Sequence, residues 1–112
     1  MSPGKFKAYI GDPDFHDGVV VRIRRASGQV DVEVEGYSGT HYLVLFDGVT
    51  SVMTRNPEGM VLYALTEMEA DGTSRHFVFA NSREADQEGG ESALEIEARE
   101  FTVRRIVPGQ TQ

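Results

Sequence analysis

The chain has 112 residues, of which 39% are hydrophobic and none is cysteine, and its formal net charge is -7. Its length predicts a single domain, 1–112, and the lack of cysteine excludes disulfides, thiolate metal sites and thiol catalysis. The acidic balance disfavours nucleic acid and anionic membrane as partners, because a phosphate-binding surface needs clustered Lys and Arg, but it allows a basic protein partner. No signal peptide or membrane span is found, so we expect a cytoplasmic protein. The preference for Arg over Lys is typical of a GC-rich bacterial gene.

From Gly18 to Val107 apolar residues alternate with polar ones, which is the period of half-buried strands. No window shows a helical period. We therefore predict an all-β fold, an antiparallel meander of about seven or eight strands that forms a sandwich or a partly open barrel. Residues 1–10 are expected to be only partly ordered, and residues 108–112 to form a frayed tail.

Residues 18–37 form the clearest predicted hairpin, with a two-residue turn at Ser27-Gly28. Apolar matching and charge complementarity across this hairpin agree on a single register. The predicted apolar pairs are Ile23 with Val32 and Val21 with Val34, and the predicted ion pairs are Arg24 with Asp31 and Arg22 with Glu33.

The stretch Thr40–Asp47 is apolar at both parities, which predicts a central strand covered on both faces. A weaker strand, Val49–Met53, follows the turn at Asp47-Gly48. A second hairpin is predicted from Met60–Ala70 and Thr73–Ala80 about Asp71-Gly72. A two-residue loop would place Leu65 opposite Val78, Ala64 opposite Phe79, and Glu67 opposite His76 as a cross-strand ion pair.

The polar stretch 81–92 is predicted to be the longest loop, with one helical turn at Ser82–Gln87. The stretch Ala93–Val107 then closes the fold. Its apolar parity changes at Arg99-Glu100, which predicts a β-bulge or a sharp bend at that point.

The segment before the first strong strand is the one concentrated polar cluster, since Asp12, Asp14, His16 and Asp17 fall within six residues. Carboxylates suit a hard cation such as Ca²⁺, and His with Asp suits a transition metal or a general base. The structural interpretation is favoured, in which the acidic side chains form turns, Phe15 enters the core, and Asp17 or His16 satisfies backbone donors. We assign no catalytic residue, cofactor or metal, and keep these four polar residues as a speculative ligand set.

Four short motifs, in this order, resemble small uncharacterised bacterial all-β domains that open with a His-Asp pair, some of which are grouped with immunity proteins of polymorphic toxin systems. The motifs are Phe15-His-Asp-Gly-Val-Val20, Glu35-Gly-Tyr-Ser-Gly39, Leu45-Phe-Asp-Gly-Val49 and Leu94-Glu-Ile-Glu-Ala98. The resemblance implies an all-β fold, a protein partner and no catalysis. Only His16 and Asp17 carry over as matched positions, and no established role comes with them.

Three functions follow as hypotheses. The leading one is a non-catalytic interaction domain, of the immunity type, that binds a basic protein and steers it with outward-facing acidic side chains. The alternatives are a metal- or small-ligand-binding domain that uses the cluster at 12–17, and a homodimer formed through edge strands at Met60–Ala70 or Ala93–Val103. The acidic residues assigned to partner binding are Asp31, Glu33, Glu35, Glu95 and Glu97.

Overall fold

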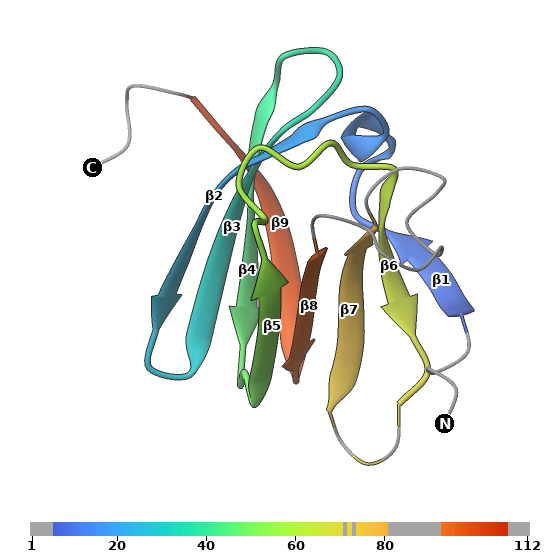
Figure 1. The fold of residues 1–112 in the computed structure, drawn as a ribbon, viewed down its shortest axis with the longest axis vertical. Coiled ribbons are helices and arrows are strands. Elements are labelled where there is room, and N and C mark those ends of the chain that lie inside the picture. The colour runs from blue at the N-terminus through green and yellow to red at the C-terminus, as the bar shows by residue number, and fades with distance from the viewer. Residues whose placement is uncertain (1–5, 71, 73, 81–92, 108–112) are drawn as a thin grey trace.

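The computed structural model describes residues 6–70, 72, 74–80 and 93–107 (Figure 1). This part of the chain forms nine β-strands and one short 3₁₀ helix, η1 (Pro13–Phe15). Within it, no helix is long and apolar enough to cross a membrane. Because the described residues form strands and only this one short helix, the all-β prediction is confirmed.

The strands form two antiparallel sheets that are not closed into a barrel, an arrangement compatible with a sandwich. The five-stranded sheet has the order β1 (Phe6–Ile10), β6 (Ala64–Met68), β7 (Arg75–Ala80), β8 (Ala93–Ala98) and β5 (Ser51–Arg55). The four-stranded sheet has the order β2 (Val19–Ala26), β3 (Gln29–Glu35), β4 (His41–Asp47) and β9 (Glu100–Ile106). Consecutive strands pair in β2–β3–β4 and in β6–β7–β8, whereas β1, β5 and β9 join partners that are distant in the sequence.

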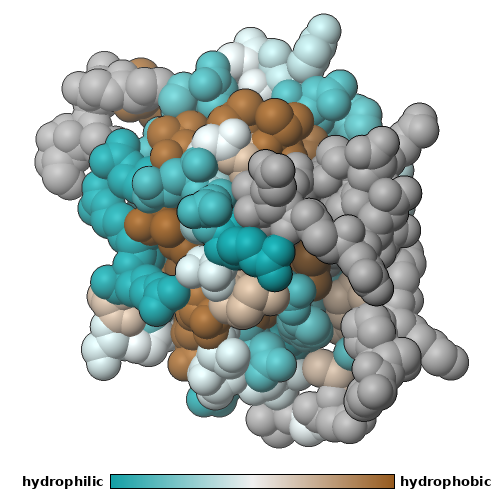
Figure 2. Space-filling model, viewed as in Figure 1, coloured by the Kyte–Doolittle hydropathy of each residue, from teal (hydrophilic) through white to brown (hydrophobic). Residues whose placement is uncertain are grey.

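One hydrophobic core lies between the sheets, because alternate residues of both face inward. Phe46 of the four-stranded sheet contacts Phe77 and Phe79 of the five-stranded sheet, with ring centroids 5.1 and 5.9 Å apart. Phe15 of η1 extends this core, and its ring lies 5.1 Å from that of Tyr42. On the face of the molecule that Figure 2 shows, apolar and polar residues are interleaved.

The first hairpin has the predicted register near its turn, where Ile23 pairs with Val32, and the two predicted ion-pair positions are opposite each other. The predicted pair of Val21 with Val34 is wrong. A register shift between Val20 and Arg22 places Val20 opposite Val34, and Val20 is the fully buried residue. A bulge of one residue reverses the parity of a strand beyond it, which alternation alone does not reveal.

The second hairpin is displaced by one residue from the predicted register. Leu65 pairs with Phe79 rather than Val78, and Glu67 pairs with Phe77 rather than His76. Because Leu65, Phe77 and Phe79 are all buried, packing on the core face decides the register over the two-residue turn. The predicted ion pair of Glu67 with His76 is therefore replaced by others, described below.

Strand β4 is an inner strand, as predicted, but it is covered on one face only. Tyr42, Val44 and Phe46 are buried, while Leu43 and Leu45 on the outer face are half-buried. The apolar residues of the outer face lie among long polar side chains of the neighbouring strands, which lets them remain partly exposed.

The predicted break near Arg99 is a sharp bend at which the chain passes from one sheet to the other, with β8 before it and β9 after it. The segment 6–10, which was not predicted to be a strand, is β1. The weak strand begins at Ser51 rather than Val49. The predicted loop at 81–92 and the predicted tail at 108–112 lie outside the residues that the structure describes.

The position of the strands also corrects the edges proposed for a homodimer. Strand β6 lies between β1 and β7, and β8 lies between β7 and β5, so neither is an edge. Of the stretch Ala93–Val103, only the part in β9 lies at an edge, because β9 pairs with β4 alone among the described strands.

Candidate functional site

The polar segment 12–17 connects β1 to β2 and forms η1. Asp12 is the N-cap of this helix, and its Oδ1 accepts a hydrogen bond from the Asp14 backbone N–H at 2.8 Å. Pro13 occupies the first turn, where a missing N–H costs nothing, and Phe15 inserts into the core. These positions agree with the turn-forming interpretation of this segment.

Asp14 joins η1 to the turn after β3. Its carboxylate accepts hydrogen bonds from the Ser38 hydroxyl (2.7 Å), the Ser38 backbone N–H (3.0 Å) and the Tyr42 hydroxyl (3.0 Å). The Ser38 hydroxyl is the main reason that the pKa of Asp14 is lowered, with the Ser38 N–H and Tyr42 adding to it against partial desolvation. Gly36 lies directly against the Asp14 carboxylate, where a Cβ would collide with it.

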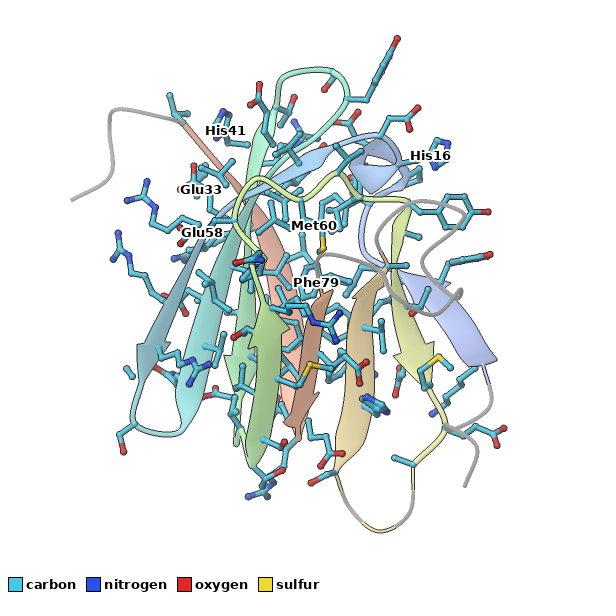
Figure 3. All side chains as sticks on the ribbon, viewed as in Figure 1. His16, Glu33, His41, Glu58, Met60 and Phe79 are labelled. Carbon is cyan, nitrogen blue, oxygen red and sulfur yellow. The ribbon has the colours of Figure 1, made fainter. Side chains whose placement is uncertain are left out.

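His16 and Asp17 project into solvent at the other side of η1, as Figure 3 shows for His16. The Nδ1 of His16 lies 3.0 Å from the Tyr63 carbonyl oxygen, and because a carbonyl only accepts, Nδ1–H donates this hydrogen bond. Nε2 of His16 is left facing the Asp17 carboxylate at 3.8 Å. Asp17 has a left-handed backbone (φ 67), and its N–H donates to the Leu62 carbonyl at 2.8 Å.

The four residues of the speculative ligand set therefore point in different directions. Asp14 faces Ser38 and Tyr42, Asp12 caps η1, and His16 is held on Tyr63. Among the described residues, no group of three or more His, Asp or Glu side chains is placed to hold a metal ion. The sequence predicted that Asp17 or His16 would satisfy backbone donors, but the carboxylates that accept backbone N–H groups here are those of Asp12 and Asp14.

A pocket of about 380 Å³ lies where η1 meets β1 and β6. Its rim carries three rings, those of Tyr9, His16 and Tyr63, and its inner end is apolar, lined by Ile10, Phe15 and Leu65. We call it the aromatic pocket. Phe15 and Leu65 belong to the main core, so the inner wall of the pocket is held rigidly by the sandwich.

The Tyr63 ring contacts the other two rings edge to face. Tyr63 lies 6.3 Å from Tyr9 and 5.2 Å from His16 between ring centroids, with interplanar angles of 74° in both pairs. A hydrogen bond between the two tyrosine hydroxyls is the main cause that raises the pKa of Tyr9. Tyr9 is 62% exposed, so its ring is accessible at the rim.

The charge around the aromatic pocket is negative. Asp12 is part of the lining, Asp17 is next to His16, and no Lys or Arg is among the described residues that line the pocket. A hollow with aromatic rings and carboxylates, but no basic side chain, favours a cationic group over an anionic one.

The acidic residues assigned to partner binding do not form one surface. Asp31, Glu33 and Glu35 lie on the outer face of the four-stranded sheet, and Glu95 and Glu97 on the outer face of the five-stranded sheet. Several are also engaged within the molecule. Glu33 binds Arg22 at 3.1 Å and His41 at 2.9 Å, and Glu95 binds His76 at 2.9 Å. Glu33 and His41 appear together in Figure 3, far from His16.

Sequence reasoning found His16, Asp12 and Asp17 but missed Tyr9 and Tyr63. Tyr9 was in a segment expected to be only partly ordered, and Tyr63, in the predicted strand Met60–Ala70, was given no ligand-binding role. The pairing of β1 with β6, which brings Tyr9 next to Thr66, joins segments that are distant in the sequence. No local signal predicts such a pairing. Comparison of the chain with family models, with curated proteins and with solved structures gives no match.

Proposed function

We propose that this protein is a non-catalytic binding domain for a basic protein partner, and that the aromatic pocket receives a cationic side chain of that partner. The observation that carries the proposal is the combination of three rim rings, Tyr9, His16 and Tyr63, with flanking carboxylates and no basic side chain in the part of the lining that the structure describes. A guanidinium or ammonium group is attracted to aromatic faces, and more strongly where it is desolvated.

The His16 ring supports this choice of ligand. With Nδ1–H donating to the Tyr63 carbonyl, the ring is held with Nε2 3.8 Å from the Asp17 carboxylate. This carboxylate can accept hydrogen bonds from a cationic donor that lies against the rim rings. An Arg side chain provides a planar fork of donors that can stack on a ring while it binds a carboxylate.

The net charge of -7 supports a basic partner at long range, because a field of one sign raises the rate of encounter with an opposite charge. The resemblance to bacterial all-β domains, some of which are grouped with immunity proteins, is consistent with a toxin as that partner. On this proposal the contact surface is centred on η1 and the β1–β6 edge of the molecule, and not on the acidic side chains of the two outer sheet faces.

The test is a titration of the ¹⁵N-labelled protein with an arginine-rich peptide, followed by NMR. We expect shifts that concentrate on the residues of the aromatic pocket. The Tyr63→Leu variant should bind the peptide about 10-fold more weakly, because it loses the ring shared by both aromatic contacts. Asp17→Asn should weaken binding less and reduce its dependence on salt.

Tyr37→Leu is the matched control. Tyr37 is also an exposed tyrosine, but it lies in the turn between β3 and β4 and is not among the described residues that line the pocket. It should bind the peptide as the unmodified protein does. Equal binding by Tyr63→Leu and the unmodified protein, or shifts centred on the outer face of the four-stranded sheet, would contradict the proposal.

A further inference from the structure

Strand β9 leaves one of its two edges without a described partner. It pairs over its whole length with β4, from Glu100 opposite Asp47 to Ile106 opposite His41. No described residue hydrogen-bonds to its second edge. The strand has seven residues, whereas the edge strands of the other sheet, β1 and β5, have five each. It contains no proline and no lysine, the residues that commonly protect an edge strand from pairing. Such an edge is a template for pairing with another strand.

The first half of the opposite edge of the same sheet, formed by β2, is covered by the segment that precedes β6. Val20 exchanges backbone hydrogen bonds with Gly59 and Met60, at 2.7 and 2.9 Å. The Ile23 N–H donates to the Glu58 carboxylate at 3.2 Å. The β2 edge is therefore partly covered, whereas the β9 edge is paired with no described residue along its whole length.

The sequence of β9 is self-complementary in one antiparallel register. If two copies pair about a two-fold axis at Thr102, Glu100 of each copy faces Arg104 of the other on the outer sheet face. On the inner face, Phe101 of each copy faces Val103 of the other. Shifting the axis to Val103 removes both charge pairs, and shifting it to Arg104 places two arginines opposite each other. Charge and apolar matching therefore agree on the axis at Thr102.

We propose that two copies of this chain associate through β9 in this register, so that the two four-stranded sheets form one continuous sheet across the dimer. The proposal does not involve the aromatic pocket, which is built from η1, β1 and β6. The dimer and the binding of a basic partner can therefore be tested separately.

The absence of cysteine allows a direct test of the register. Directly opposite residues in antiparallel strands have Cα atoms about 4.5–5.5 Å apart, within the range that a disulfide spans. Thr102→Cys should therefore give a covalent dimer under mild oxidation. Arg104→Cys is the control, because the two introduced thiols would lie about 14 Å apart along the paired strands.

Charge reversal provides the second measurement, read by light scattering and sedimentation over a range of protein concentrations. Arg104→Glu and Glu100→Arg should each weaken dimerisation about 10-fold, and the double variant should restore it. Arg105→Glu changes the net charge equally but lies outside the proposed charge pairs, so it should not weaken the dimer. All variants are compared for their thermal midpoints to confirm folding.

A dimer that is cross-linked by Thr102→Cys and rescued by the double charge exchange supports the proposal. A monomeric mass at every concentration, cross-linking by Arg104→Cys or Val103→Cys instead of Thr102→Cys, or no rescue by the double variant overturns it.

Discussion

Asp14 shows how a residue of a suggestive polar cluster serves the fold. Its carboxylate accepts hydrogen bonds from Ser38 and Tyr42, and its backbone carbonyl accepts one from the Tyr37 N–H at 2.8 Å. A carboxylate that accepts several hydrogen bonds is stabilised in its charged form. Asp14 therefore fixes η1 against the turn after β3, and in this way it positions Phe15 and the aromatic pocket.

This role predicts a pH-dependent loss of stability in Asp14→Asn. The pKa of Asp14 is lowered on folding, chiefly by the Ser38 hydroxyl, so its contribution is present at neutral pH. That contribution is lost as the pH falls from about 4 through the lowered pKa of the folded state. We expect a lower thermal midpoint than that of the unmodified protein at pH 7, with a difference that narrows toward pH 2.5.

Thermal melts at several pH values measure this difference. Asp31→Asn is the control, because the Asp31 carboxylate accepts no hydrogen bond from a described residue. It should change the midpoint less. A deficit in Asp14→Asn that stays constant from pH 7 to pH 2.5 would show that the charged form of Asp14 is not what stabilises the fold.

At the scale of elements, the β6–β7 register creates a buried ion pair on the core face. Glu67 is 4% exposed, and Arg75 donates two hydrogen bonds to it, both of 2.9 Å. These bonds, with Lys7 at 3.5 Å, hold the pKa of Glu67 below its usual range. Arg75 also lies over the rings of Phe77 and Phe101, at 5.2 and 5.5 Å. The pair thus covers the aromatic core at the end of the sandwich.

Removing one member of this pair should cost more than removing both. Arg75→Met is expected to lower the free energy of unfolding by about 3 kcal/mol, because it leaves the buried Glu67 carboxylate with only the exposed Lys7 as a cationic partner. The partial exposure of Arg75 places the effect at the lower end of the range for buried pairs. Adding Glu67→Met should recover much of this loss, since two apolar side chains then pack together.

Urea denaturation of both single variants and the double variant gives the unfolding free energies needed for a double-mutant cycle. A double variant whose loss equals the sum of the two single losses would show that Glu67 and Arg75 act independently. The sequence did not predict this pair, because it assigned Glu67 to His76 from an assumed two-residue turn. The first hairpin was predicted better, since charge and apolar matching both constrained it near its turn.

At the scale of the molecule, the sequence predicted the class of the fold and its local hairpins but not its connectivity. Period-two alternation identifies strands wherever one face is buried. It does not identify which distant strands pair, and so β1 with β6, β5 with β8 and β4 with β9 could not be predicted. The aromatic pocket depends on the first of these pairings. Of the residues at its rim, only His16 could therefore be predicted, because it belongs to the polar cluster at 12–17.

The same connectivity predicts slow folding. Phe6 pairs with Met68, and His41 with Ile106, so several long loops must close before the core between the sheets is complete. Sheets built on non-local pairing fold in milliseconds to seconds, in contrast to the microseconds of local helical bundles. We expect refolding from urea in that slower range. Because the chain has four Tyr and no Trp, stopped-flow tyrosine fluorescence provides the signal. Refolding within microseconds would mean that the long-range pairs do not limit the rate, and that the local hairpins alone set the folding barrier.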